Sequence, residues 1–153
     1  MTVPVSFNSV TSNFSLPLLF SGQAQKEFFI NEALALIDAL LQFAVNSSIG
    51  DPPANPADGE CYRVAGVGTG DWAGQEDKIA AYFAGGWHFV SPHDGMVIFD
   101  RTAGEMLRFK TAWVSVSPPA TPQGGAVIDA EARQALADLT EALRNIGIFP
   151  PAT

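Results

Sequence analysis

The histidines and carboxylates of this sequence are the residues that could carry acid–base or metal chemistry. His88 lies in an apolar stretch and His93 in the turn SPHDGM, and no third ligand follows at the spacing of a zinc site. Cleavage of a polysaccharide would need two carboxylates across a cleft, for which Asp94 with Asp100 or Glu76 are the available residues. Since nothing in the sequence marks such a pair, we expect no catalytic residues, no metal and no cofactor. A polysaccharide-cleaving enzyme is kept as an alternative.

The glycine-rich stretch GVGTGDWAG, residues 66–74, superficially resembles a phosphate-binding loop. No Lys-Ser or Lys-Thr pair follows it, and the next element is a β-like run instead of a helix whose N-terminus could hold phosphate. Asp71, Glu76 and Asp77 could bind calcium weakly or accept hydrogen bonds from sugar hydroxyls, although an exposed acidic loop is the simpler interpretation. The single cysteine, Cys61, cannot form an intrachain disulfide and is interpreted as a small core residue.

Two ten-residue stretches of the chain nearly repeat each other. FAGGWHFVSP at 83–92 and FKTAWVSVSP at 109–118 have Phe, Trp, Val, Ser and Pro at equal offsets. We interpret each as a hairpin in which a strand ends at Phe, a two-residue turn follows, and Trp opens the return strand. The aromatic rings then either pack in a core or interface, or stack on sugars where they are exposed. The candidate sugar-binding residues are Trp72, Trp87, Trp113 and Tyr82.

The composition limits the classes of partner. The chain has 153 residues and a formal net charge of −8, with only eight Lys and Arg residues. This is the length of one ordinary domain. A nucleic-acid or anionic membrane surface would require clustered basic residues, so neither is expected as a partner. With 47% hydrophobic residues and a mean hydropathy of +0.14, the chain has much apolar surface to hide, some of it in a partner.

The longest apolar run covers residues 28–45 and is interrupted by four polar residues: Asn31, Glu32, Asp38 and Gln42. It therefore cannot cross a bilayer as about 20 uninterrupted apolar residues would. The N-terminus has neither the basic start nor the long apolar stretch of a secretory signal, so we expect synthesis in the cytoplasm.

The elements of the first part of the chain follow from periodicity. Residues 1–15 lack a helical period and are expected to form an extended arm, either loose or added as a strand to a neighbour. A helix is predicted from about residue 23 to 45, with Ser21 as its cap. Apolar residues wrap more than half of it, which predicts a largely buried helix. Residues 50–59 are rich in Pro and Gly and predict an ordered surface turn.

Residues 60–116 contain short β-rich runs joined by short turns. The runs are CYRVA, KIAAYFA, WHFVS, MVIFD, EMLRFK and AWVSV. Links this short favour hairpins, and hence an antiparallel meander. We predict an α+β fold in which residues 16–116 form one domain, with the N-terminal helix packed on the sheet.

A Pro/Gly linker at residues 117–125 leads to a C-terminal oligomerisation helix within 126–153. Asp129 is the expected N-cap and Gly147 the expected C-cap. A helix this short is marginal alone in water, so it must dock on its own domain or bundle with copies from other subunits. Two adjoining heptad seams would provide the contacts, and the interface residues are Ile128, Ala132, Leu136, Leu139, Leu143 and Ile146.

The block FSLPLLFSGQAQKEFFINEALALIDAL, residues 14–40, is long and specific. It resembles the signature of a domain family of unknown function found in tail-fibre and head-spike proteins of phages and phage-like gene transfer agents. The stretch from PPANPADGECYRV to DGMVIFDR is similar to the body of the same family, so the resemblance covers roughly residues 14–116. The final helix also resembles the short helix that closes many such fibre proteins.

The resemblance implies a virion component without enzymatic activity, in the role of a spike or fibre base. It implies a symmetric homo-oligomer, for which a trimer and a pentamer both remain open. The arm would attach to a capsid, neck or tail protein, and the sheet and final helix would support self-association and a distal spike or fibre protein. Engagement of the cell surface would bring the particle to host surface polysaccharide.

Overall fold

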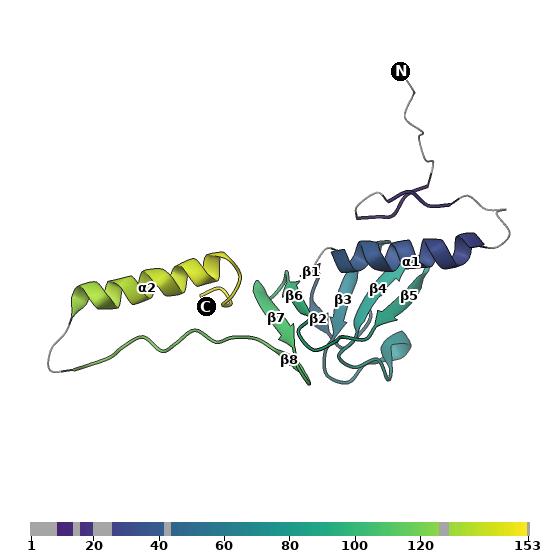
Figure 1. Cartoon of the computed structure of the whole chain (residues 1–153). Coiled ribbons are helices and arrows are strands. Elements are labelled where there is room, and N and C mark those ends of the chain that lie inside the picture. The colour runs from purple at the N-terminus through teal and green to yellow at the C-terminus, as the bar shows by residue number, and fades with distance from the viewer. Residues whose placement is uncertain (1–8, 14–15, 20–25, 42–43, 126–128, 153) are drawn as a thin grey trace, which may run out of the picture. The chain divides into compact units, whose positions relative to one another are not determined.

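The computed structural model describes residues 9–13, 16–19, 26–41, 44–125 and 129–152, and shows an α+β fold (Figure 1). The chain divides into two compact units, residues 1–91 and 92–153. This boundary falls inside the region 16–116 that the sequence analysis treats as one domain. Strands β5 (Gly86–Val90) and β6 (Val97–Asp100), which flank the boundary, belong to different sheets.

The first unit contains a four-stranded sheet with the order β2-β3-β4-β5. The strands are β2 (Ser48–Ile49), β3 (Cys61–Val64), β4 (Ile79–Phe83) and β5. The β3–β4 and β4–β5 pairs are antiparallel, as predicted, but β2 pairs with β3 in parallel. β2 lies before residues 60–116, the range of the predicted antiparallel meander, so this pair adds a strand that the sequence did not predict. Another two-residue strand, β1 (Ala44–Val45), precedes β2.

The core of the first unit lies on one face of this sheet. Cross-strand partners share a face, so the pairs Tyr62 with Ala80 and Tyr82 with Trp87 point to the same side. The buried cluster on that side consists of Tyr62, Val64, Trp72 and Ala80, with Ile49, Trp87 and Phe89 packed against it. Cys61 is 2% exposed, which confirms its assignment as a core residue.

Helix α1 (Lys26–Leu41) contacts β4. The predicted helix extended to residue 45, but Ala44 and Val45 form a strand; the predicted cap, Ser21, lies outside the described residues. The prediction that the helix is largely buried was also wrong. Phe29 is 79% exposed, and Ile30, Ile37 and Leu41 are each close to half exposed. Within the first unit only part of α1 is covered, so these four apolar side chains face outward.

The predicted arm, residues 1–15, is described only at residues 9–13. There the chain folds back on itself, because Val10 forms an antiparallel bridge with Pro17. Thr11 is 6% exposed. The described part of the arm is therefore neither loose nor fully extended, since it packs within its own unit.

The second unit contains three consecutive antiparallel strands: β6, β7 (Glu105–Phe109) and β8 (Trp113–Val114). All six predicted β-runs are confirmed, although the repeated hairpins differ in their turns. Phe83 pairs with Gly86 across a two-residue turn, whereas Phe109 pairs directly with Trp113 across three residues. The prediction of two-residue turns in both copies was wrong for the second.

After the strands, residues 115–125 contain no helix or strand and are mostly exposed, as expected of a linker. Helix α2 (Ala130–Asn145) follows, and the side chain of Asp129 caps it by accepting a 2.9 Å hydrogen bond from the N–H of Ala132. Gly147 adopts a φ of +76° just beyond the end of the helix. The Gly147 and Ile148 N–H groups donate back to the carbonyls of Arg144 and Leu143, a Schellman arrangement. Both predicted caps are confirmed.

Candidate functional site

A cleft of about 640 Å³ lies in the first unit and is our first candidate site. Its walls come from four parts of the chain: the N-terminal segment (defined as residues 9–13 and 16–19), α1, the loop before β3 at Asp58 and Gly59, and the β4–β5 hairpin. This volume is in the range of clefts that hold small ligands. No motif in the sequence marks the cleft, so it was not predicted.

The buried carboxylate of Asp38 holds the N-terminal segment against α1. One of its oxygens accepts a 2.7 Å hydrogen bond from the hydroxyl of Thr11, and the other accepts a 2.8 Å bond from the N–H of Asn13. Asp38 is only 3% exposed. A buried carboxylate is tolerated where hydrogen bonds compensate for its lost hydration, so these contacts fix the position of the cleft wall.

Asn31, seven residues earlier on α1, provides a second attachment of the N-terminal segment. The amide of Asn31 accepts from the N–H of Leu19 at 2.8 Å and donates to the carbonyl of the same residue at 3.1 Å. Gly59 also lies close to this segment. A side chain at position 59 would place its Cβ atom 2.6 Å from the Cβ of Ser12. A larger residue at position 59 would push this wall away from the rest of the unit.

One wall of the cleft carries a stacked pair of rings. Phe83 and His88 lie on adjacent strands with ring centroids 3.6 Å apart and planes inclined by 8°. Nδ1 of His88 is 3.9 Å from a carboxylate oxygen of Glu32 on α1. The imidazole therefore bridges the sheet and the helix, and it lies beside a carboxylate that is largely in contact with solvent.

The candidate sugar-binding aromatics are brought together only in part. Trp87 contacts Trp72 and Tyr82, at centroid distances of 4.9 and 5.0 Å. Trp72 is 0% exposed, so it cannot present a face to a sugar; it closes the core beneath Trp87. Trp87 and Tyr82 are partly exposed, whereas Trp113 belongs to the second unit and packs on Phe109 at 5.2 Å.

The glycine-rich loop before β4 is held by a carboxylate, and a strand follows it instead of an α-helix. Hydrogen bonds from the backbone N–H groups of Glu76 itself and of Gly68 lower the pKa of the Glu76 carboxyl below its ordinary value. The Gly68 bond is 3.2 Å long. Only one short 3₁₀ turn, Gly70–Trp72, interrupts the loop. The loop therefore positions Trp72 in the core.

The other acid–base candidates lie in or beside turns of the second unit. The carboxylate of Asp100 is 3% exposed and accepts from the N–H groups of Thr102 and Ala103, so it shapes the turn between β6 and β7. Asp94 and His93 lie exposed in the preceding turn. Among the residues that the structure describes, no group of three or more His, Cys, Asp or Glu side chains could hold a metal ion.

The apolar seam of α2 is our second candidate site. We define the α2 seam by its described members, Ala132, Leu136, Leu139, Leu143 and Ile146; the sixth predicted residue, Ile128, lies outside the described residues. None of the 16 residues of α2 is buried. Leu136, Leu139 and Ile146 are 49%, 56% and 61% exposed, respectively.

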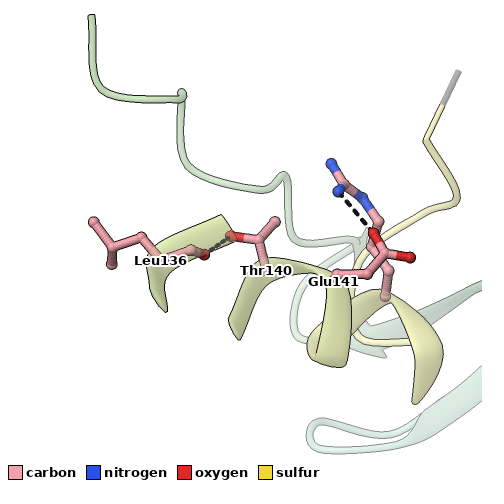
Figure 2. A network of polar contacts seen from close by, with 4 residues as sticks. Leu136, Thr140 and Glu141 are labelled. Atoms are coloured by element: carbon pink, nitrogen blue, oxygen red, sulfur yellow. Dashed lines mark hydrogen bonds and ion pairs between the residues drawn. The ribbon is translucent and has the colours of Figure 1, made fainter. Parts of the chain in front are cut away.

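The polar side chains of α2 bond within the helix or to the linker, where the guanidinium of Arg133 donates to the carbonyls of Pro122, at 3.1 Å, and of Gly124. Figure 2 shows the hydroxyl of Thr140 donating to the carbonyl of Leu136 at 2.9 Å, and an ion pair of 3.4 Å between Arg144 and Glu141. Since these groups pair one turn apart on the helix, they do not attach it to the sheet. Attachment comes instead from the chain after the helix, where the carbonyl of Gly147 accepts a 2.7 Å bond from the N–H of Met106.

A protein-family model described as a protein of unknown function (DUF2793) matches residues 30–114, which is more than half of the chain. The match includes most of α1, all strands and the aromatic cluster. No protein of the curated collection matches the chain. Of the described helices, neither is both long and apolar enough to cross a membrane.

Proposed function

The chain belongs to the DUF2793 family of proteins of unknown function, and we propose that it is a structural virion protein without enzymatic activity. It serves as a base or adaptor for a head spike or tail fibre of a phage or gene transfer agent. In this role it forms a symmetric homo-oligomer, a trimer or a pentamer, and supports attachment of the particle to the host cell surface.

The observation that carries the proposal is the exposed α2 seam. A helix of 16 residues gains little stability from its backbone alone, and burial of its apolar face normally supplies the rest. Here three large apolar side chains of the seam are about half exposed or more. Because about half of each side chain is already covered, burying the rest would contribute roughly 1 kcal/mol each, about half of the value for full burial, so a partner helix of the same kind gives a favourable driving force.

Two further features support self-association around an axis. Of the residues beside the seam, Ala135, Thr140 and Ala142 carry no charge and Arg133 carries one, so repulsion between neighbouring copies there is limited to one side chain. The C-terminal end of the helix is tied to the sheet of the second unit by Phe149, which is 6% exposed, and by the Gly147–Met106 bond. An anchored helix presents its seam in one orientation, which favours a closed ring of identical contacts.

The partners follow from the same role. The N-terminal arm, residues 1–15, attaches to a capsid, neck or tail protein, and the sheet and the C-terminal helix support self-association and a distal spike or fibre protein. The resemblance of residues 14–40 to fibre and spike proteins supports this assignment. The apolar stripe of α1, with Phe29 at 79% exposure, offers additional surface for an assembly partner.

The test is to locate the chain in purified particles. A strain that produces particles would carry a small tag at the C-terminus of this chain, and labelled antibody would be imaged by electron microscopy. The proposal predicts label at one symmetric location, at a capsid vertex, the neck or the tail tip. Label absent from particles, while the chain accumulates in the lysate, would contradict it.

A second candidate function is a carbohydrate-binding module for host surface polysaccharide. Trp87 and Tyr82 favour it, because their contacting rings are partly exposed on one face of the sheet. Trp87→Ala should then abolish retention on host polysaccharide while the circular dichroism spectrum stays unchanged. Unchanged retention would exclude this surface.

A further inference from the structure

We propose that the cleft of the first unit is a docking site for an arginine side chain of a partner protein. This inference goes beyond the virion role, because it concerns a different unit from the α2 seam and does not require self-association.

Carboxylates dominate the charged groups that line the cleft. They are Glu27, Glu32 and Asp38 on α1, and Asp58 in the loop before β3. No Lys or Arg is among the lining residues that the structure describes. Of the described lining residues, the only other titratable ones are His88 and Tyr82, and the side chain of Tyr82 points to the opposite face of the sheet with Trp87. A cationic group is therefore the complementary occupant.

The four carboxylates differ in their exposure to solvent: two are buried and two are exposed. Asp38 and Glu27 are 3% and 8% exposed, and Asp38 uses both oxygens to hold the N-terminal segment. Glu32 and Asp58 are exposed instead, and the side chain of Glu32 is 55% exposed. These two carboxylates can receive a cation that approaches from solvent, while the buried pair adds negative potential from below.

The walls between the charges are mostly apolar. Ala35 and Ala39 of α1 face the cleft, as do Ala81 of β4 and Leu18 of the N-terminal segment. An occupant with an apolar stem and a cationic head matches this arrangement, which describes the side chains of Lys and Arg. A compact metal ion or a small hydrated ammonium would leave the apolar walls uncovered.

The stacked Phe83–His88 pair selects arginine over lysine. A planar guanidinium can stack against flat rings and can bond a carboxylate through two parallel N–H groups, whereas an ammonium can do neither. The ring of His88 lies beside Glu32, with Nδ1 and a carboxylate oxygen 3.9 Å apart. A flat surface and an exposed carboxylate are thus adjacent in the cleft.

The experiment uses the full-length chain and two probes of matched shape. Nitrogen-15 correlation spectra are recorded during titration with Nα-acetyl-arginine methylamide and with the citrulline analogue, which is nearly isosteric but uncharged. We expect the arginine probe to shift the amides of Ala35, Ala81 and His88, with an affinity that falls as salt is added. The citrulline probe should bind at least about threefold more weakly.

Matched variants assign the effect to the cleft. Glu32→Gln and Asp58→Asn should each weaken binding of the arginine probe by about three- to tenfold, because each removes one charge-assisted partner. Asp71→Asn, which removes an exposed carboxylate outside the cleft, should leave binding unchanged. The unperturbed remainder of each spectrum shows that the variant is folded.

Three results would overturn the proposal. The first is an absence of shifts with arginine probe at millimolar concentrations, and the second is equal binding of the citrulline and arginine probes. The third is equal weakening by Asp71→Asn and Glu32→Gln, since this would indicate general attraction to an acidic protein. Each of these outcomes leaves the test of the α2 seam unaffected.

Discussion

The carboxylate of Asp38 accepts a 2.7 Å hydrogen bond from the hydroxyl of Thr11, which lies 27 positions earlier in the chain. Both residues are nearly inaccessible to solvent. The same Asp38 is one of the polar residues that interrupt the long apolar run of the sequence. Asp38 therefore has a structural role in the fold, because it attaches the N-terminal segment to α1 and lines the cleft.

Replacing Asp38 should release this wall. Asp38→Ala leaves the Thr11 hydroxyl and the Asn13 N–H without their acceptor, and should lower the free energy of unfolding by about 1–3 kcal/mol. Amide hydrogen exchange of residues 9–18 should accelerate more than that of β4. The control is Asp58→Ala, which removes an exposed carboxylate of the same cleft and should change the unfolding free energy little. Equal effects of the two variants would contradict the assigned role of Asp38.

Gly147 should be intolerant of a side chain. Its φ of +76° is strained for other residues, and an added Cβ would come within 2.6 Å of the Phe99 ring. Gly147→Ala should therefore destabilise the chain, measured by urea denaturation. Gly124→Ala is the matched control, because Gly124 has a φ of +73° but nothing within 4 Å of its Cβ position.

The difference between these two variants isolates the contact with Phe99. We expect Gly147→Ala to cost about 1–3 kcal/mol more than Gly124→Ala. Equal costs would show that backbone strain alone matters and that the end of α2 is not closely packed on the sheet.

The loop that positions Trp72 should loosen in acid. The folded-state pKa of Glu76 is lowered by hydrogen bonds from backbone N–H groups. Its contribution to stability is thus fully present above the unfolded-state pKa, and is lost as the pH falls through the folded-state pKa. The amide shift of Gly68, which donates to this carboxylate, should titrate with a midpoint below the ordinary glutamate value. Glu76→Gln should abolish this titration, and a midpoint at or above the ordinary value would contradict the assignment.

Cys61 should report the opening of the first unit. It is the single cysteine of the chain and is 2% exposed, so a thiol reagent should react slowly with the native protein and rapidly in denaturant. Because the residue lies on β3, faster labelling in Asp38→Ala would show that loss of the cleft wall also loosens the sheet. Native labelling as fast as that of the denatured chain would contradict the packing described for this strand.

Local signals in the sequence predicted much of the fold. The six β-runs and both caps of α2 depend on periodicity and on turn residues close to the elements that they end, as for Asp129 and Gly147. The parallel pairing of β2 with β3 could not be predicted, because two-residue strands carry no period. The longer turn of the second hairpin was hidden by the equal spacing of Phe and Trp in both copies.

The candidate sites were predictable to different degrees. The α2 seam follows from heptad spacing, and its exposure agrees with a helix that lacks a partner within its unit. The cleft depends on contacts between residues far apart in sequence, such as Asp38 with Thr11, and no spacing rule finds these. Polar residues at Asn31, Glu32 and Asp38, in the otherwise apolar stretch 28–41 of α1, were the available signal. The exposure of an aromatic ring is likewise a tertiary property, so Trp72 could not be separated from Trp87 in advance.

The native mass of the full-length chain in solution tests the central claim, self-association through the α2 seam, most directly. We predict a single closed oligomer, a trimer or pentamer of the 16.2 kDa chain, by light scattering coupled to size-exclusion chromatography. Leu139→Asp, in the seam, should dissociate it, while Ala137→Asp, which places the same charge outside the seam, should leave the mass unchanged. A monomeric wild-type chain with α2 still helical, or a Leu139→Asp variant of undiminished mass, would contradict the account.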